Sequence, residues 1–171
     1  EAARCSNTVF PGLLCLHGHG TLEQLTRFDR PLILVLEHEG QRAYAVLLGV
    51  GKRHVQLDFA AESLELDREV LPQFWAGEFI AVWRTPLSVP VSLRKGEAGA
   101  AVAWVKNQLN LLDGGQAADM GPAFFDAALE ARVRKLQLAY GIAADGIVGP
   151  ATLFALSALD EAGPHLAHAL E

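Results

Sequence analysis

Cysteine and histidine are the residue types in this chain that could carry covalent or metal chemistry. The two cysteines, Cys5 and Cys15, flank the turn sequence Phe10-Pro11-Gly12. In an oxidising compartment this spacing would allow a disulfide, which stabilises a fold by about 2 to 3 kcal/mol in a chain-entropy model. Two ordinary buried thiols fit the same pattern, so the residues alone leave both interpretations open.

The histidines give a weaker signal for a metal site. His17 and His19 would lie on one face of a strand, and His38 and His54 follow further along the chain. No carboxylate or cysteine cluster with ligand spacing joins them in the sequence. We therefore predict no metal ion and no other cofactor.

The most specific string in the chain is glycine-rich and runs from Asp145 to Thr152 as Asp-Gly-Ile-Val-Gly-Pro-Ala-Thr. Its glycines permit backbone angles that other residues resist, and Pro150 suits the first turn of a following helix. Ile147 and Val148 are expected to point into a core. Taken one residue at a time, the string predicts a well-built turn rather than a binding site.

The composition is that of a globular protein with room for two modest domains. The 171 residues are 51% hydrophobic and carry a formal charge of −6. Because the sequence has no lysine- or arginine-rich block, nucleic acid is a poor candidate partner. The longest apolar run, around residues 31–36, is far shorter than the roughly 20 residues of a membrane helix. The polar first residues do not resemble a signal peptide, and we expect a fragment of a longer protein.

The elements that must position these residues change character near Pro86 and Pro90. Before the prolines, runs of β-forming residues predict a sheet, and Glu39-Gly40 predicts a hairpin turn. Helical turns are predicted at 21–28, with Thr21 as N-cap, and at 67–75. The predicted strands are 13–16, 32–38, 42–50, 54–59, 63–66 and 78–83. This half is therefore expected to be α+β, with an antiparallel sheet.

Beyond the prolines, apolar residues recur at the spacing of amphipathic helices. Asp126 is placed to cap the second helix and Gly141 to end it. The three predicted helix faces are Val102, Val105, Leu109 and Leu112; Leu129, Val133, Leu136 and Tyr140; and Leu153, Leu156 and Leu159. We divide the chain into a β-rich domain at 1–85, a linker at 86–92, an all-α domain at 93–160 and a tail at 161–171.

The segment from Leu93 to Leu159 closely resembles the peptidoglycan-binding domain found on many cell-wall hydrolases. The resemblance rests on the glycine and valine spacing that leads into the first helix, on Leu136-Gln137, and on the glycine-rich string. It departs from the usual pattern at Asp126, Leu129 and Val105-Lys106.

The resemblance implies peptidoglycan as the ligand, bound through its stem peptide or its glycan. Stem peptides carry carboxylates, amides and an amino group, so a shallow site needs a cation, amide-type side chains and fixed donors. The expected contact residues are Arg132, Gln137, Tyr140, Asp145 and Thr152. Asp145 could equally cap its own turn.

The first half resembles the papain-like cysteine peptidases that process double-glycine leader peptides. The resemblance covers roughly residues 5–83 and follows the Arg30-Pro31 run, the strand with Tyr44, and Phe74-Trp75-x-Gly77-Glu78. In that family a histidine precedes the tyrosine and acts as the general base, whereas this chain has Ala43. Asp58 stands at the third catalytic position, but alanine cannot take the proton of a cysteine thiol. The resemblance thus implies a degenerate peptidase fold that is not an enzyme.

The two domains in this order resemble the periplasmic region of general secretion pathway protein A, a family of inner-membrane ATPases implicated in assembling the type II secretin. The resemblance implies a non-catalytic periplasmic module that anchors a secretion assembly protein to the cell wall, and it favours a Cys5–Cys15 disulfide. General secretion pathway protein B and the secretin are further candidate partners, and self-association stays open.

Two alternatives belong to other classes. One is a cell-wall or peptide hydrolase whose catalytic residues lie partly outside this chain, against which Ala43 argues. The other is a purely structural interaction domain with a degenerate wall-binding groove.

Overall fold

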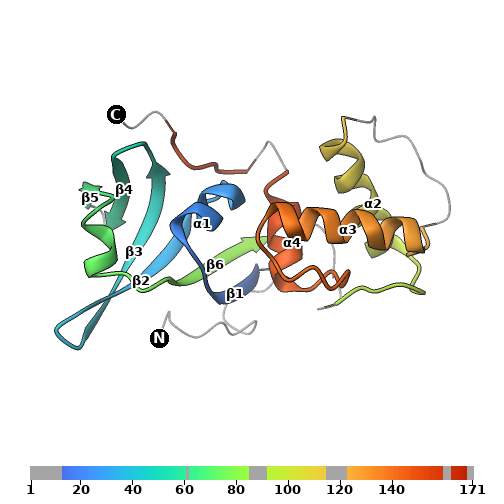
Figure 1. The fold of residues 1–171 in the computed structure, drawn as a ribbon, viewed down its shortest axis with the longest axis horizontal. Helices are drawn as coiled ribbons and strands as arrows, with labels where there is room; N and C mark the ends of the chain where they lie inside the picture. Colours follow the sequence, from blue (N-terminus) through green and yellow to red (C-terminus); the bar gives the residue numbers. More distant parts are fainter. Residues whose placement is uncertain (1–12, 61, 85–91, 115–122, 160–162, 169–171) are drawn as a thin grey trace. The chain divides into compact units, whose positions relative to one another are not determined.

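The computed structural model describes residues 13–60, 62–84, 92–114, 123–159 and 163–168, which form two compact units (Figure 1). The first, the sheet unit, has six strands in the order β1-β6-β2-β3-β4-β5. The pairings of β2 with β3 and β6, and of β4 with β3 and β5, are antiparallel. Its elements are β1 (Leu13–His19), α1 (Leu22–Phe28), β2 (Leu32–His38), β3 (Gln41–Val50), β4 (His54–Phe59), β5 (Glu62–Asp67), η1 (Leu71–Gln73) and β6 (Glu78–Arg84). The predicted α+β fold with an antiparallel sheet is confirmed.

Local chemistry explains most of these boundaries. Glu39 and Gly40 have φ angles of 51° and 76°, as a two-residue hairpin turn between β2 and β3 requires. Thr21 caps α1 by accepting a hydrogen bond from the Gln24 amide at 3.2 Å. The helical turns predicted at 67–75 are present as the short 3-10 turn η1, and no longer helix forms there. Strand β5 continues to Asp67, and Pro72 lacks the amide hydrogen that a longer helix would use.

The core of the sheet unit forms where α1 packs against the sheet. Leu25 and Phe28 of α1 are buried, and the ring centroid of Phe28 lies 6.3 Å from that of Phe79 on β6. Leu34 and Leu47, on the paired strands β2 and β3, are fully buried. One helix therefore supplies the apolar cover that a half-buried antiparallel sheet needs.

Residues 163–168, which we call the strap, belong to the sheet unit although the helical unit lies between them and β6 in the sequence (Figure 1). Ala167 pairs with the end of β3: its amide donates to the Leu48 carbonyl at 2.9 Å, and its carbonyl accepts from the Val50 amide at 2.8 Å. Leu166 is only 3% exposed. The segment predicted as a tail thus contributes both backbone pairing and core to the sheet unit.

Polar side chains also hold the strap. Arg30 is buried, and its Nη1 donates to the Pro164 carbonyl at 2.9 Å. The guanidinium occupies the space beside Gly163, where an added Cβ would lie 1.8 Å from Nη1. Asp29 pairs with His165 at 2.9 Å and with His168 at 2.6 Å. Burial raises the pKa of Asp29, but the hydrogen bonds from His168 and His165 and their charges outweigh it, and the pKa falls below its ordinary value of 3.8.

The helical unit contains α2 (Ala100–Leu112), α3 (Ala127–Ala139) and α4 (Pro150–Ser157), which confirms the predicted three-helix domain. Leu112 is an exception to the predicted faces, because it ends α2 and is 47% exposed. No helix in the described ranges is both long and apolar enough to cross a membrane. Apart from residue 92, the predicted linker lies outside the described residues. The predicted face residues that are buried here are Val102, Val105, Leu109, Leu129, Val133, Leu136, Leu153 and Leu156.

The ends of these helices place the turn between α3 and α4. Asp126 caps α3 by accepting a hydrogen bond from the Leu129 amide at 2.7 Å, as predicted. Val148 forms a two-way backbone bridge with Leu93, at 2.8 and 3.2 Å. The start of the unit is thereby held against the glycine-rich turn, which brings the residues just after Leu93 to the candidate site.

Candidate functional site

One buried side chain, Gln137 of α3, organises the turn that follows this helix. It is 1% exposed, and its Oε1 accepts a hydrogen bond from the Gly146 amide at 2.9 Å. Its Nε2 lies within hydrogen-bond distance of Asp145 Oδ1 and the Ile147 carbonyl, both at 2.9 Å, and of Thr152 Oγ1 at 3.1 Å. Both ends of the amide are used, so Gln137 fixes the conformation of the turn from inside.

Asp145 stabilises the same turn from its outer side. Its Oδ1 accepts the Ile147 amide at 2.8 Å, a local carboxylate-to-backbone contact typical of a turn-forming aspartate. This hydrogen bond is the main cause of a lowered pKa; burial raises the pKa, and the Gln137 bond and the nearby Arg134 charge lower it further. Asp145 is therefore an anion at neutral pH and is fixed in place by the backbone.

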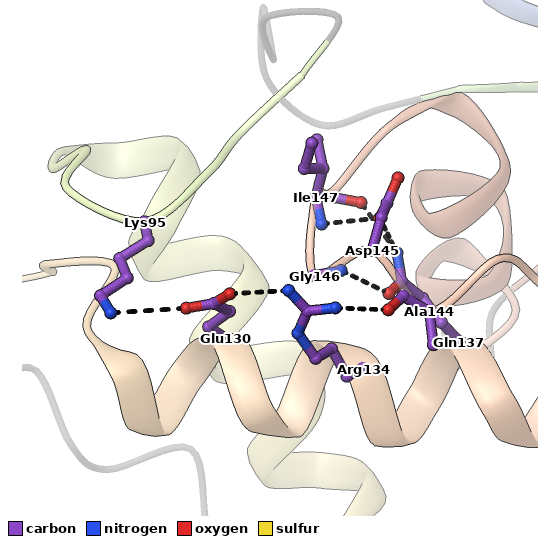
Figure 2. Close-up of polar contacts among 8 residues, drawn as sticks. All are labelled: Lys95, Glu130, Arg134, Gln137, Ala144, Asp145, Gly146 and Ile147. Carbon is purple, nitrogen blue, oxygen red and sulfur yellow. Dashed lines mark hydrogen bonds and ion pairs between the residues drawn. The ribbon is translucent and has the colours of Figure 1, made fainter.

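Three charged residues lie beside the turn and were not among the predicted site residues. Arg134 donates through Nη1 to the Ala144 carbonyl and through Nη2 to Glu130 Oε1 at 2.9 Å, and Lys95 Nζ lies 3.7 Å from Glu130 Oε2 (Figure 2). The hydrogen bond from Arg134 is the largest cause of a lowered pKa at Glu130. The result is a line of ionised side chains along one side of the turn.

Gly146 makes this arrangement possible. Its φ of 76° is in the left-handed region, and an added Cβ would lie 2.9 Å from Glu130 Cγ and 3.0 Å from Arg134 Nε. A side chain at this position would push both charged side chains away from the turn. The glycine therefore serves two purposes, the backbone conformation and the close approach of Glu130 and Arg134.

The structure brings three of the five predicted contact residues together, in a role different from the predicted one. Gln137 and Thr152 are each 1% exposed and bonded within the turn, so we assign them to holding it rather than to touching a ligand. Asp145 completes the group. The prediction that Ile147 and Val148 both enter the core is correct for Val148, which is fully buried, and wrong for Ile147, which is 37% exposed.

Arg132 and Tyr140 lie apart from that group. Arg132 pairs with Asp113 at the end of α2, with Nη2 2.8 Å from Oδ2. Residues two apart on a helix point to different sides, so Arg132 does not share the side of α3 occupied by Arg134. Tyr140 is the C-cap residue of α3. Their predicted contacts with a ligand stay predictions.

Of the three residues that the sequence prediction missed, Glu130 and Arg134 have a recognisable sequence signal and Lys95 has none. Glu130 and Arg134 stand four residues apart on α3, a spacing that predicts an ion pair on one helix face. Lys95 comes close because the segment around it bonds to Val148 on one side and to Phe125 on the other, contacts without a local sequence signal.

Position 43 and Asp58, which the family resemblance places at the general-base and third catalytic positions, lie on neighbouring strands of the sheet unit. Directly paired residues on neighbouring strands point to the same face, and successive residues alternate. Asp58 of β4 pairs with Val46, which is three residues from Ala43 on β3. Asp58 and position 43 therefore face opposite sides of the sheet, and Asp58 would not orient a base at that position.

Cysteine and histidine side chains of the sheet unit occur together on β1, which carries Cys15, His17 and His19. Cys15 lies on β1, whereas Cys5 is outside the described residues, so the predicted disulfide stays a prediction. His17 pairs with Glu78 at 2.8 Å. Among the residues that the structure describes, no group of three or more histidine, cysteine and acidic side chains is placed to hold a metal ion.

Two family models match this chain, one for each half. Residues 2–85 match the family described as "GspA, peptidase C39-like domain", and residues 98–156 match the "Putative peptidoglycan binding domain". The fold and the turn thus define a two-domain protein with a peptidase-like sheet domain followed by a domain of the peptidoglycan-binding class.

Similar proteins narrow the family further. General secretion pathway protein A of Aeromonas hydrophila is 33% identical over 93% of this chain and 29% of its own length. A periplasmic domain of the EpsAB fusion protein of the Vibrio vulnificus type II secretion system superposes with a TM-score of 0.58 at 30% identity, over 90% of this chain and 67% of the other. The chain belongs to the general secretion pathway protein A family, and it spans less than a third of the length of the Aeromonas relative.

Proposed function

We propose that this chain is a periplasmic module that binds peptidoglycan and anchors a type II secretion assembly protein to the cell wall. The observation that carries the proposal is the turn between α3 and α4, in which the buried Gln137 holds a glycine-rich loop against an exposed line of charges. The match of residues 98–156 to the peptidoglycan-binding family and the names of the two relatives support it.

In this proposal the sheet unit supplies no catalysis. Ala43 offers no general base, and Asp58 faces the other side of the sheet. Its role is then to support the wall-binding unit or to contact a secretion partner, for which general secretion pathway protein B and the secretin are the candidates. These partners come from the family relationship.

Co-sedimentation of the whole chain with purified sacculi tests the proposal. We expect the protein in the pellet at moderate salt and an unrelated acidic protein of similar size in the supernatant. If the chain stays in the supernatant over a range of sacculus concentrations, the wall-binding function is wrong.

A second measurement separates binding from hydrolysis. Sacculi and a double-glycine peptide are incubated with the chain, and the soluble products are analysed by mass spectrometry. We expect neither substrate to be cut. Cleavage that thiol alkylation abolishes would support the hydrolase alternative instead.

A further inference from the structure

The charged side chains beside the turn alternate in sign. Lys95, Glu130 and Arg134 follow one another through ionic contacts of 3.7 and 2.9 Å, and Arg134 then reaches the Ala144 carbonyl, next to Asp145 (Figure 2). We call these four charged residues, Lys95, Glu130, Arg134 and Asp145, the charge row. A row with two cations and two anions has no net charge, so it is not suited to a ligand that carries one sign only.

The charge row is held by hydrogen bonds within the protein, and its two cations are also exposed to solvent. The hydrogen bonds of Arg134 to the Ala144 carbonyl and to Glu130 use two of the five N–H donors of its guanidinium, and the Arg134 side chain is 44% exposed. The Lys95 side chain is 59% exposed, and its ammonium carries three donors. Gln137 and Gly146 fix the turn whose Ala144 carbonyl holds Arg134. A rigid charged group loses little conformational freedom when a ligand binds.

We propose that the charge row recognises the zwitterionic stem peptide of peptidoglycan rather than its glycan strand, an inference that rests on the proposed function. Lys95 and Arg134 donate hydrogen bonds to the peptide carboxylates, and Asp145 and Glu130 accept hydrogen bonds from the ammonium of its diamino acid. Charge-assisted hydrogen bonds to ionised groups are about twice as strong as those between neutral groups. The hydroxyl and amide groups of the sugars are neutral, so a row of ions discriminates in favour of the peptide.

Ile147 gives the row an apolar neighbour. Its side chain is 37% exposed although it belongs to a turn whose next residue, Val148, is fully buried. Its own amide and carbonyl are bonded to Asp145 and Gln137, so its exposure is set by the turn. An exposed aliphatic group beside ions suits a peptide that carries methyl and methylene groups between its charges.

The test compares intact sacculi with their peptide-free glycan. The whole chain is titrated with intact sacculi and with the glycan strands that an amidase releases by removing the stem peptides, and free stem tripeptide serves as a competitor. We expect binding to intact sacculi, at least tenfold weaker binding to the stripped glycan, and displacement by the tripeptide.

Matched variants test the residues. Lys95→Gln and Arg134→Gln should each weaken binding about tenfold, the loss expected for one charge-assisted hydrogen bond. Lys135→Gln is the control, because it makes the same charge change at an exposed position of the same helix and should bind like the wild type. Lys95→Gln leaves the helix unaltered, so its result stands even if Arg134→Gln perturbs the fold.

The outcomes separate the two proposals. If the wild type binds intact sacculi and peptide-free glycan strands equally, or if Lys95→Gln and a folded Arg134→Gln bind like Lys135→Gln, the charge-row inference is wrong and the wall-binding function stands. If the wild type binds neither sacculi nor glycan strands, the proposed function is wrong and the inference falls with it.

Discussion

The turn after α3 and the strap are each held by a buried polar side chain, Gln137 and Arg30 respectively. The two regions differ in how far along the sequence the bonded residues lie from that side chain. Gln137 bonds residues 8 to 15 positions away, whereas Arg30 reaches Pro164 across 134 positions. The bonds of Gln137 stay within α3, the turn and the start of α4. The strap bonds instead to β3 and to the residues that follow α1, which are distant from it in the sequence. The turn is therefore a local structure and the strap a non-local one, although a side-chain hydrogen bond holds each of them.

The largest expected effect comes from Gln137→Leu, which removes the hydrogen bonds that hold the turn after α3. This change leaves the Gly146 amide, the Thr152 hydroxyl and the Ile147 carbonyl without their buried partner, and we expect the helical unit to lose about 3 kcal/mol. Hydrogen exchange of the α3 and α4 amides measures the loss separately from the sheet unit. Lys135→Gln on the same helix should leave exchange unchanged. A loss below about 0.5 kcal/mol would show that the turn does not depend on Gln137.

A smaller loss of stability is expected from Arg30→Met, which removes the hydrogen bond between Arg30 and the strap. This variant keeps most of the apolar stem but removes the charged donor to the Pro164 carbonyl, and we expect the strap to loosen by about 2 kcal/mol. The Ala167 amide, which bonds the Leu48 carbonyl, reports this through faster exchange. The β2 amides should exchange at the wild-type rate.

Gly163→Ala provides an independent check on the same contact. Its added Cβ would displace the Arg30 guanidinium, so it should also accelerate exchange at Ala167. Normal protection of Ala167 in both variants would contradict the role given to Arg30.

The same distinction explains which parts of the structure the sequence predicts. The α3 cap at Asp126, the hairpin at Glu39-Gly40 and the three helices each follow from residues a few positions apart, and each prediction is confirmed. The strap has no such signal, because Leu166 and Ala167 acquire partners only in the folded sheet unit.

The candidate site divides in the same way. The glycine-rich string identified the turn, but the roles of its residues depend on which side chains point inward. Thr152 was predicted to contact the ligand and is buried, whereas Ile147 was predicted to be buried and is exposed. Side-chain direction in an irregular turn follows from its own φ and ψ angles, which a periodic pattern does not encode.

A smaller effect is expected when acid weakens the attachment of the strap to the sheet unit. The pKa of Asp29 is lowered in the folded state, so its contribution to stability is fully present above the ordinary value of 3.8 and is lost as the pH falls below it. The wild-type strap should therefore loosen below about pH 4, as followed by the NMR signal of the Ala167 amide.

Asp29→Asn is the matched variant, because asparagine also tolerates the left-handed backbone of this position, where φ is 51°. It should show a looser strap at neutral pH and a flatter response in acid. An identical acid response in the variant would mean that the pairs of Asp29 with His165 and His168 do not hold the strap.

The smallest effect is expected at the surface pair between Arg132 and Asp113. The Arg132 side chain is 30% exposed and that of Asp113 is 52% exposed, and ion pairs in contact with solvent contribute about 0 to 1 kcal/mol. Arg132→Gln should therefore leave the exchange of α3 amides within about 0.5 kcal/mol of the wild type. The same variant tests the predicted role of Arg132 in binding. If Arg132→Gln keeps its stability but sediments less with sacculi, Arg132 contacts the ligand as predicted. Wild-type sedimentation would instead restrict recognition to the side of α3 that carries Arg134.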